Sequence, residues 1–142
     1  AKGLATKESQ GTIDMIATDH APHATDDKNV TFDLAANGII GLETALPVLL
    51  TKLVHECGHS PAWLIKRMSS NPAQIFGLPG GTLSPGAAAD ICVIDPLQEW
   101  TIDKNAFYSK SRNTPYHGTK VTGCVWLTIV NGNVIFDGRA SR

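Results

Sequence analysis

Cysteine is scarce in this sequence of 142 residues, and its placement argues against the usual cysteine chemistry. The three cysteines, Cys57, Cys92 and Cys124, are odd in number and lie far apart. Because no C-x-x-C pair is present, neither a zinc knuckle nor a dithiol redox motif is expected. Cys92 and Cys124 lie in apolar runs, where a free cysteine packs as a small hydrophobic residue. We therefore predict reduced thiols, which are typical of a cytoplasmic protein.

A surplus of charge and long apolar runs are also missing. Lys and Arg number 12 against 13 Asp and Glu, which gives a net charge of −1. This balance predicts no binding surface for nucleic acid or for a membrane. No run of about 18 apolar residues predicts a transmembrane helix. The sequence begins at Ala1 without an initiator methionine or a signal-peptide core, so it reads as part of a longer one.

The most informative stretch is residues 13–23 (IDMIATDHAPH), an apolar run that ends at a carboxylate and two histidines. Residues 13–18 are short, rich in β-branched side chains and apolar on both faces, which predicts a strand buried in a parallel sheet. Asp19, His20 and His23 would then follow the carboxyl end of that strand, where barrel and open α/β enzymes carry their chemistry. An isolated helix cap and surface histidines are the alternative. One carboxylate and two imidazoles within five residues favour a site.

A loop and a helix are predicted next. Residues 24–37 form a polar loop that is long enough to be a lid or a substrate loop. Asn37 and Gly38 close it, and glycine there would let backbone N–H groups approach a ligand. Residues 42–54 show the single apolar stripe of an amphipathic helix. Pro47 lies within that stripe and is expected to kink or loosen the first turns.

Two further helices are predicted from their first residues. Ser60 and Asn71 would act as N-caps, and Pro61 and Pro72 would occupy the first helical positions. Gly77 would end the second of these helices, and Gly58 would end the preceding amphipathic helix as a left-handed cap.

Beyond residue 78 the composition changes to turn residues and β-branched runs. The Asn131-Gly132 pair is a strong hairpin signal and would join the last two strands. We therefore divide the chain into two units, residues 1–78 and residues 79–142. The strands predicted in the second unit cover residues 89–95, 100–102, 121–130 and 133–136.

Residues 55–59 (HECGH) match the zinc-protease pattern H-E-x-x-H. That chemistry needs both histidines one turn apart on a continuous helix. Gly58 is expected to end the helix before His59, and Ser60 begins the next one. The pattern is therefore interpreted as a chance match, with His55 and His59 as solvated polar residues.

Two other groups are weaker candidates. Residues 110–118 form a basic loop, for which packing against its own domain is favoured over anion binding. Trp63, Trp100 and Trp126 lie in or beside apolar patterns and are predicted to be core residues.

Residues 13–23 resemble the last barrel strand of the dihydroorotases of the amidohydrolase superfamily. The resemblance covers essentially the whole chain, and its first two motifs separate dihydroorotases from allantoinases and dihydropyrimidinases. It implies an α/β fold: the C-terminal end of a metal-dependent (β/α)8 TIM barrel over residues 1–78, then part of a small β-sandwich domain over residues 79–142. The other matching motifs are residues 38–47 (GIIGLETALP), 69–73 (SSNPA), 86–96 (GAAADICVIDP), 113–118 (NTPYHG) and 128–132 (TIVNG).

The resemblance also implies an activity and its residues. Dihydroorotases interconvert dihydroorotate and N-carbamoyl-L-aspartate in pyrimidine biosynthesis, with one or two Zn²⁺ ions per active site. Asp19 would be both a zinc ligand and the catalytic acid/base, and His23 would bind substrate. Asn37 and Gly38 would meet the substrate through their backbone. The family often has an aromatic residue where this chain has Asn37, and a backbone donor survives that change.

Most of the implied metal site is absent from the sequence. A TIM barrel needs about 200 residues or more, and a catalytic zinc takes three protein ligands or more. Asp19 is one ligand, so the remaining ligands are expected outside this chain, and the chain alone is expected to be inactive.

Three readings follow from the resemblance. The favoured one is part of a genuine cytoplasmic dihydroorotase acting on a small-molecule substrate, with a homodimer and a complex with aspartate transcarbamoylase as the assemblies left open. The second is a related cyclic amidohydrolase of the allantoinase or dihydropyrimidinase type, or a non-catalytic dihydroorotase-like partner of aspartate transcarbamoylase. The presence of Asp19 disfavours the non-catalytic version. The third, a stand-alone binding module, is disfavoured because a lone barrel strand leaves unpaired edges.

Overall fold

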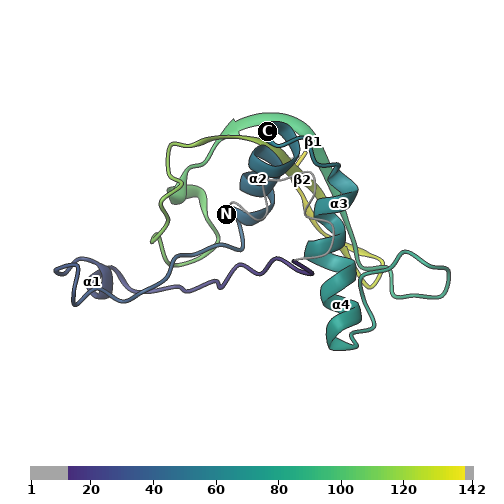
Figure 1. Cartoon of the computed structure of the whole chain (residues 1–142), viewed down its shortest axis with the longest axis horizontal. Coiled ribbons are helices and arrows are strands. Elements are labelled where there is room, and N and C mark those ends of the chain that lie inside the picture. Colours follow the sequence, from purple (N-terminus) through teal and green to yellow (C-terminus); the bar gives the residue numbers. More distant parts are fainter. Residues whose placement is uncertain (1–12, 140–142) are drawn as a thin grey trace.

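The computed structural model describes residues 13–139, in which short helices pack beside an antiparallel sheet (Figure 1). Residues 1–10 are polar, which predicts the tail of a helix or a loop, and they lie outside the described residues. Within residues 13–139, every helix is too short or too polar to span a membrane. The elements in chain order are α1 Thr25–Lys28, α2 Ala45–Leu49, the π-helix η1 Leu50–Glu56, α3 Pro61–Ile65, the π-helix η2 Lys66–Ser70, α4 Asn71–Phe76, β1 Ile91–Thr101, the 3₁₀-helix η3 Lys104–Ala106, β2 Lys120–Val130 and β3 Asn133–Asp137.

The predicted amphipathic helix is present as α2 followed directly by η1. Pro47 is the third residue of α2, in the first turn, where backbone N–H groups have no intrahelical acceptor. The missing N–H of Pro47 therefore removes no helical hydrogen bond. Gly58 ends the helix in the left-handed region at φ 76°, as predicted, and its N–H donates to the carbonyl of Val54.

The second helical column runs through α3, η2 and α4 without a break. Ser60 caps it as predicted, because its Oγ accepts the N–H of Trp63 at 3.2 Å. As predicted, α4 begins at Asn71 with Pro72 in its first turn, but the prediction that Asn71 is its N-cap is wrong. The side chain of Asn71 donates instead to the carbonyl of Asp14 at 2.6 Å, and the helix continues through it.

Pro72 changes the hydrogen-bond pattern within this continuous helix. In η2 the bonds span five residues, since the N–H of Asn71 donates to the carbonyl of Lys66. In that register the carbonyl of Arg67 would pair with the N–H of residue 72, which proline lacks. The Arg67 carbonyl is thereby left open, and it accepts the N–H of Ile16 at 3.1 Å.

Residues 13–18 were predicted to form a strand, and this is wrong for the described chain. They run as an unpaired segment, because a strand exists only where a neighbour pairs with it, and residues 13–139 supply none (Figure 1). Helix η2 holds the segment instead, where the Nε of Arg67 donates to the carbonyl of Ile13 at 3.1 Å. The segment leading to Asp19 is thus fixed by side-chain contacts.

Within the described residues, β1, β2 and β3 form an antiparallel sheet in that order. β1 joins the two strands predicted over residues 89–95 and 100–102, with an irregularity in register between Asp95 and Glu99. Asn131 and Gly132 adopt positive φ angles of 48° and 79°, which confirms the predicted hairpin.

Leucines of the helices form the core and face the sheet. Leu50, Leu53 and Leu64 are buried together. The hydroxyl of Thr51 accepts the N–H of Thr122 on β2 at 2.8 Å, which ties η1 to the sheet. This packing joins the two units predicted from the sequence, whose boundary near residue 79 stays a prediction.

Cysteine and tryptophan divide between core and surface. Cys124 is buried, whereas Cys92 is exposed, and the cysteines are free. Trp63 and Trp100 are partly buried. Trp126 is 38% exposed, so its prediction as a core residue is wrong.

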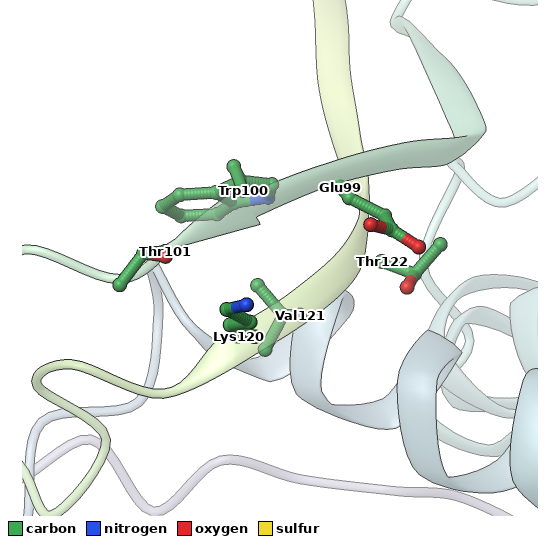
Figure 2. Close-up of a pocket in the computed structure, with 6 residues that line it drawn as sticks. All are labelled: Glu99, Trp100, Thr101, Lys120, Val121 and Thr122. Carbon is green, nitrogen blue, oxygen red and sulfur yellow. The ribbon is translucent and has the colours of Figure 1, made fainter.

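A hollow of about 320 Å³ lies at the paired ends of β1 and β2 (Figure 2). Glu99 and Lys120 are its charged lining residues, and Trp100 contributes an aromatic ring. None of the residues predicted to form the site lines it. It is therefore a feature of the sheet rather than a candidate site.

We expect Arg67→Met to lower the free energy of unfolding by about 2 kcal/mol, because it removes a buried donor and leaves the carbonyl of the half-buried Ile13 without its partner. Lys66→Met is the matched control, since Lys66 is the exposed neighbour on the same turn. Denaturant unfolding of both variants checks this. Equal stabilities would show that Arg67 does not anchor the segment.

Candidate active site

The end of the anchored segment carries the predicted carboxylate and a fixed imidazole. Asp19 is exposed, and its φ of 44° is uncommon for a residue other than glycine. The Nδ1 of His20 accepts the N–H groups of Gly41 at 3.1 Å and of Leu42 at 3.3 Å. Through these two bonds His20 ties the segment to the start of the next loop.

Two side chains hold three successive carbonyl groups of the loop that follows α1. The Nε2–H of His23 donates to the carbonyl of Asn37 at 2.8 Å. The ammonium of Lys28 donates to the carbonyl of Ala36 at 2.6 Å and to that of Gly38 at 3.1 Å. The carbonyl groups of this turn therefore point towards His23 and Lys28.

A loop from the C-terminal part of the chain completes the cluster. The Nδ2 of Asn113 donates to the carbonyls of Ala21 at 2.9 Å and of Gly38 at 3.3 Å. The hydroxyl of Ser111 donates to the carbonyl of His23 at 2.8 Å. The loop 110–118 packs against its own unit, since the N–H of Gly118 donates to the carbonyl of Ile102, and it also packs against the candidate site.

Gly38 meets its neighbours too closely for any other residue. Its φ is 102°, and a Cβ placed on it would lie 2.5 Å from the Cβ of Ala21. Among the described residues, no acceptor meets the N–H of Asn37 or of Gly38. Both residues are exposed, so these two donors are open to a ligand.

A cavity of about 270 Å³ lies beside this turn. His23, Lys28, Arg112 and Asn113 supply its polar lining. Within residues 13–139, neither Lys28 nor Arg112 forms an ion pair with a carboxylate. The cavity therefore carries two cationic groups that no carboxylate neutralises, which favours an anionic ligand.

The structure brings together three of the four residues predicted from the sequence, namely His23, Asn37 and Gly38. Asp19 lies on the same segment, four residues before His23, and no contact joins it to the other three. The prediction missed Lys28 and Asn113. Asn113 begins a motif of the family resemblance, which was a usable signal, whereas Lys28 stood in a short charged turn that resembles any solvated turn.

The described residues do not by themselves fit a zinc ion. Within residues 13–139, no group of three or more His, Cys, Asp or Glu side chains is placed to hold a metal. A catalytic zinc takes three protein ligands, and Asp19 offers one. No step of a reaction is therefore derived through a metal here.

The H-E-x-x-H pattern does not supply the missing ligands. The Nε2–H of His55 donates to the carbonyl of Pro96 at 2.7 Å. The ring of His59 stacks on Trp63 with centroids 4.1 Å apart. The two imidazoles thus meet different neighbours, which confirms that the pattern is a chance match.

The chain belongs to the amidohydrolase family, whose model matches residues 4–135. Among curated relatives it is 51% identical over 125 residues to a dihydroorotase of Acetivibrio thermocellus, covering 88% of this chain and 29% of the relative. It is also 51% identical over 132 residues to a dihydroorotase of Geotalea daltonii, covering 93% of this chain and 31% of the relative. These matches confirm the predicted resemblance. The chain spans less than a third of the length of these relatives.

Solved structures confirm the predicted fold class. An L-hydantoinase (dihydropyrimidinase) from Arthrobacter aurescens matches with a TM-score of 0.83 and 36% identity, over 89% of this chain and 29% of that chain. A D-hydantoinase (dihydropyrimidinase) from Thermus sp. matches with a TM-score of 0.84 and 28% identity, over 96% and 30%. The chain therefore has part of the α/β fold of the barrel-type amidohydrolases.

We expect Gly38→Ala to lower the free energy of unfolding by about 2 kcal/mol more than Gly86→Ala does. Both glycines have positive φ, at 102° and 89°, so both variants carry backbone strain. A Cβ at Gly38 also overlaps Ala21, whereas a Cβ at Gly86 meets nothing within 4 Å. Parallel denaturant titrations of the two variants measure the difference, and equal losses would mean that the close approach at Gly38 carries no energetic weight.

Proposed function

We propose that this chain is part of a dihydroorotase, which hydrolyses the cyclic amide of dihydroorotate reversibly to N-carbamoyl-L-aspartate in pyrimidine biosynthesis. The observation that carries the proposal is its identity of about 50% to curated dihydroorotases over most of its length. On this proposal, residues 1–78 supply the end of a TIM barrel and residues 79–142 supply part of a β-sandwich domain.

The chemistry of the candidate site supports an anionic cyclic amide as substrate. Dihydroorotate carries a carboxylate and ring carbonyl groups, and its hydrolysis product carries a second carboxylate. The open N–H groups of Asn37 and Gly38 are suited to hydrogen-bond ring carbonyls. His23 is the other residue proposed to contact the substrate. The cavity lined by Lys28 and Arg112 lies on the side of the turn that its carbonyl groups face, and its positive charge favours a negatively charged ligand there.

Asp19 would serve as the catalytic acid/base. Hydrolysis of the amide adds water to the carbonyl carbon and breaks the C–N bond, and the departing ring nitrogen takes a proton. A carboxylate can receive the proton of the attacking water and pass it to that nitrogen. Because an aspartate has a reference pKa of about 3.9, Asp19 would hold the proton only transiently near neutral pH.

The proposed cofactor is zinc, with one or two ions per active site. Asp19 would supply one ligand, and the other ligands would come from residues outside this chain. When bound, zinc makes a water nucleophilic at neutral pH by lowering its pKa to about 7. The proposed setting is the cytoplasm, and a homodimer and a complex with aspartate transcarbamoylase are the assemblies to test.

A second candidate is a related cyclic amidohydrolase of the hydantoinase or dihydropyrimidinase type. The 36% identity and TM-score of 0.83 to the L-hydantoinase favour it. Activity of the full-length protein on dihydroorotate, compared with 5-substituted hydantoins and dihydrouracil, distinguishes the two. A preference for the hydantoin or for dihydrouracil would replace the first proposal with the second.

We expect Asp19→Asn in the full-length protein to lower kcat by about 1,000-fold or more, because the amide cannot carry the proton or serve as an anionic ligand. Asp14→Asn is the matched control, since Asp14 is an exposed carboxylate on the same segment. Circular dichroism should show the same fold for both variants. Turnover retained in Asp19→Asn would remove Asp19 from its proposed role.

The purified 142-residue chain is expected to show no dihydroorotase activity, with or without added zinc, because its described residues offer one of the three ligands that a catalytic zinc needs. An assay of chain with verified intact mass near 15.1 kDa tests this. Zinc-dependent turnover by that material would show that the missing ligands are not required.

A further inference from the structure

We propose that Lys28 is a positioning residue that holds the carbonyl groups on either side of Asn37 and thereby sets the direction of the backbone N–H of Asn37. The inference rests on the proposed function, since it assigns the way in which the substrate-facing turn is held. It concerns a side chain that neither the sequence patterns nor the comparisons single out.

Lys28 bridges two carbonyl groups on either side of Asn37. It is the last residue of α1, and its ammonium donates to the carbonyl of Ala36 at 2.6 Å and to that of Gly38 at 3.1 Å. Hydrogen bonds from a charged donor are roughly twice as strong as neutral ones. Among residues 13–139 no carboxylate pairs with Lys28, so its charge is committed to these backbone dipoles.

Because the peptide bond is planar, a contact that fixes a carbonyl group also fixes the direction of the N–H group that follows it. In a trans peptide the C=O and the following N–H point in opposite directions. Because Lys28 holds the carbonyl of Ala36, the N–H of Asn37 points away from Lys28. Because His23 holds the carbonyl of Asn37, the N–H of Gly38 points away from His23. The N–H of Asn37, oriented through Lys28, and the N–H of Gly38, oriented through His23, therefore point away from the side chains that hold the turn.

On the side of α1, few contacts other than those of Lys28 hold the turn at residues 36–38. Between Lys28 and Ala36 the chain exposes its apolar side chains, with Phe32 99% exposed and Leu34 73% exposed. One backbone bond, from the N–H of Ala36 to the carbonyl of Asp27 at 3.1 Å, adds to the contacts of Lys28. Packing is thus too sparse to orient the turn, and the ammonium is the group that does so.

The test compares Lys28→Met, Lys28→Arg and the control Lys52→Met in the full-length protein. Methionine keeps much of the alkyl stem and removes the donors, whereas arginine keeps charged donors. Lys52 is exposed and pairs with Glu56 on η1, so Lys52→Met changes charge equally without touching the turn. Lys28→Gln serves as a second variant if Lys28→Met does not fold.

We expect Lys28→Met to raise KM for dihydroorotate about tenfold and to leave kcat within about twofold, because it misdirects a donor that binds substrate and transition state alike. Lys28→Arg should recover most of the loss, and Lys52→Met should match the wild type. Hydrogen exchange at Ala36, whose N–H donates to the carbonyl of Asp27, should quicken in Lys28→Met alone.

The outcomes separate this inference from the proposed function. An unchanged KM in Lys28→Met, or a fall in kcat at constant KM, would overturn the positioning role while the dihydroorotase proposal stands. If the wild-type protein does not act on dihydroorotate, the proposed function fails. Hydrogen exchange then still tests the positioning role of Lys28. Faster exchange at Ala36 in Lys28→Met would then support it, and unchanged exchange would refute it.

Discussion

A buried guanidinium is the contact on which the candidate site depends. Arg67 is 8% exposed, lies 3.8 Å from the ring centroid of Trp63 and donates to the carbonyl of Ile13. Pro72 adds a second attachment, because its missing N–H leaves the carbonyl of Arg67 open to the incoming segment. An unpaired segment has no sheet ladder to fix its direction. Its course towards Asp19 is therefore set by its contacts with one turn of η2. Loss of that turn would release the site before it unfolded the core.

Beyond that segment, the site is built mainly from side chains that bind backbone groups. His20 accepts the N–H of Gly41, His23 donates to the carbonyl of Asn37, and Lys28 donates to the carbonyl of Gly38. Such contacts orient the main chain itself, so the groups left open for a ligand are fixed without a dedicated binding side chain. This explains how Asn37 can occupy a position where related enzymes often carry an aromatic residue: the contact proposed there belongs to the backbone.

The features predicted correctly from the sequence are those whose causes lie within a few residues. Ser60 caps its own helix, Gly58 ends the preceding one, and Asn131-Gly132 forms a two-residue turn, all from local geometry. The failures have distant causes. Residues 13–18 have the composition of a buried strand, but pairing needs a neighbour that residues 13–139 do not contain. Asn71 is a residue typical of an N-cap, but its side chain is engaged by a carbonyl 57 residues away.

The same distinction between local and distant causes applies to the site. The distant contacts there come from the C-terminal part of the chain. Asn113 meets Gly38 across 75 residues of sequence, a contact that no local pattern reveals. The loop carrying Asn113 is docked at its start by Glu43, whose carboxylate accepts the N–H groups of Tyr108 and Ser109 at 2.9 and 3.0 Å. This loop connects β1 to β2, and β2 is itself fixed on η1. The sheet is therefore part of the machinery that positions the turn at Gly38, and a change in how the sheet packs on the helices should be felt at the site.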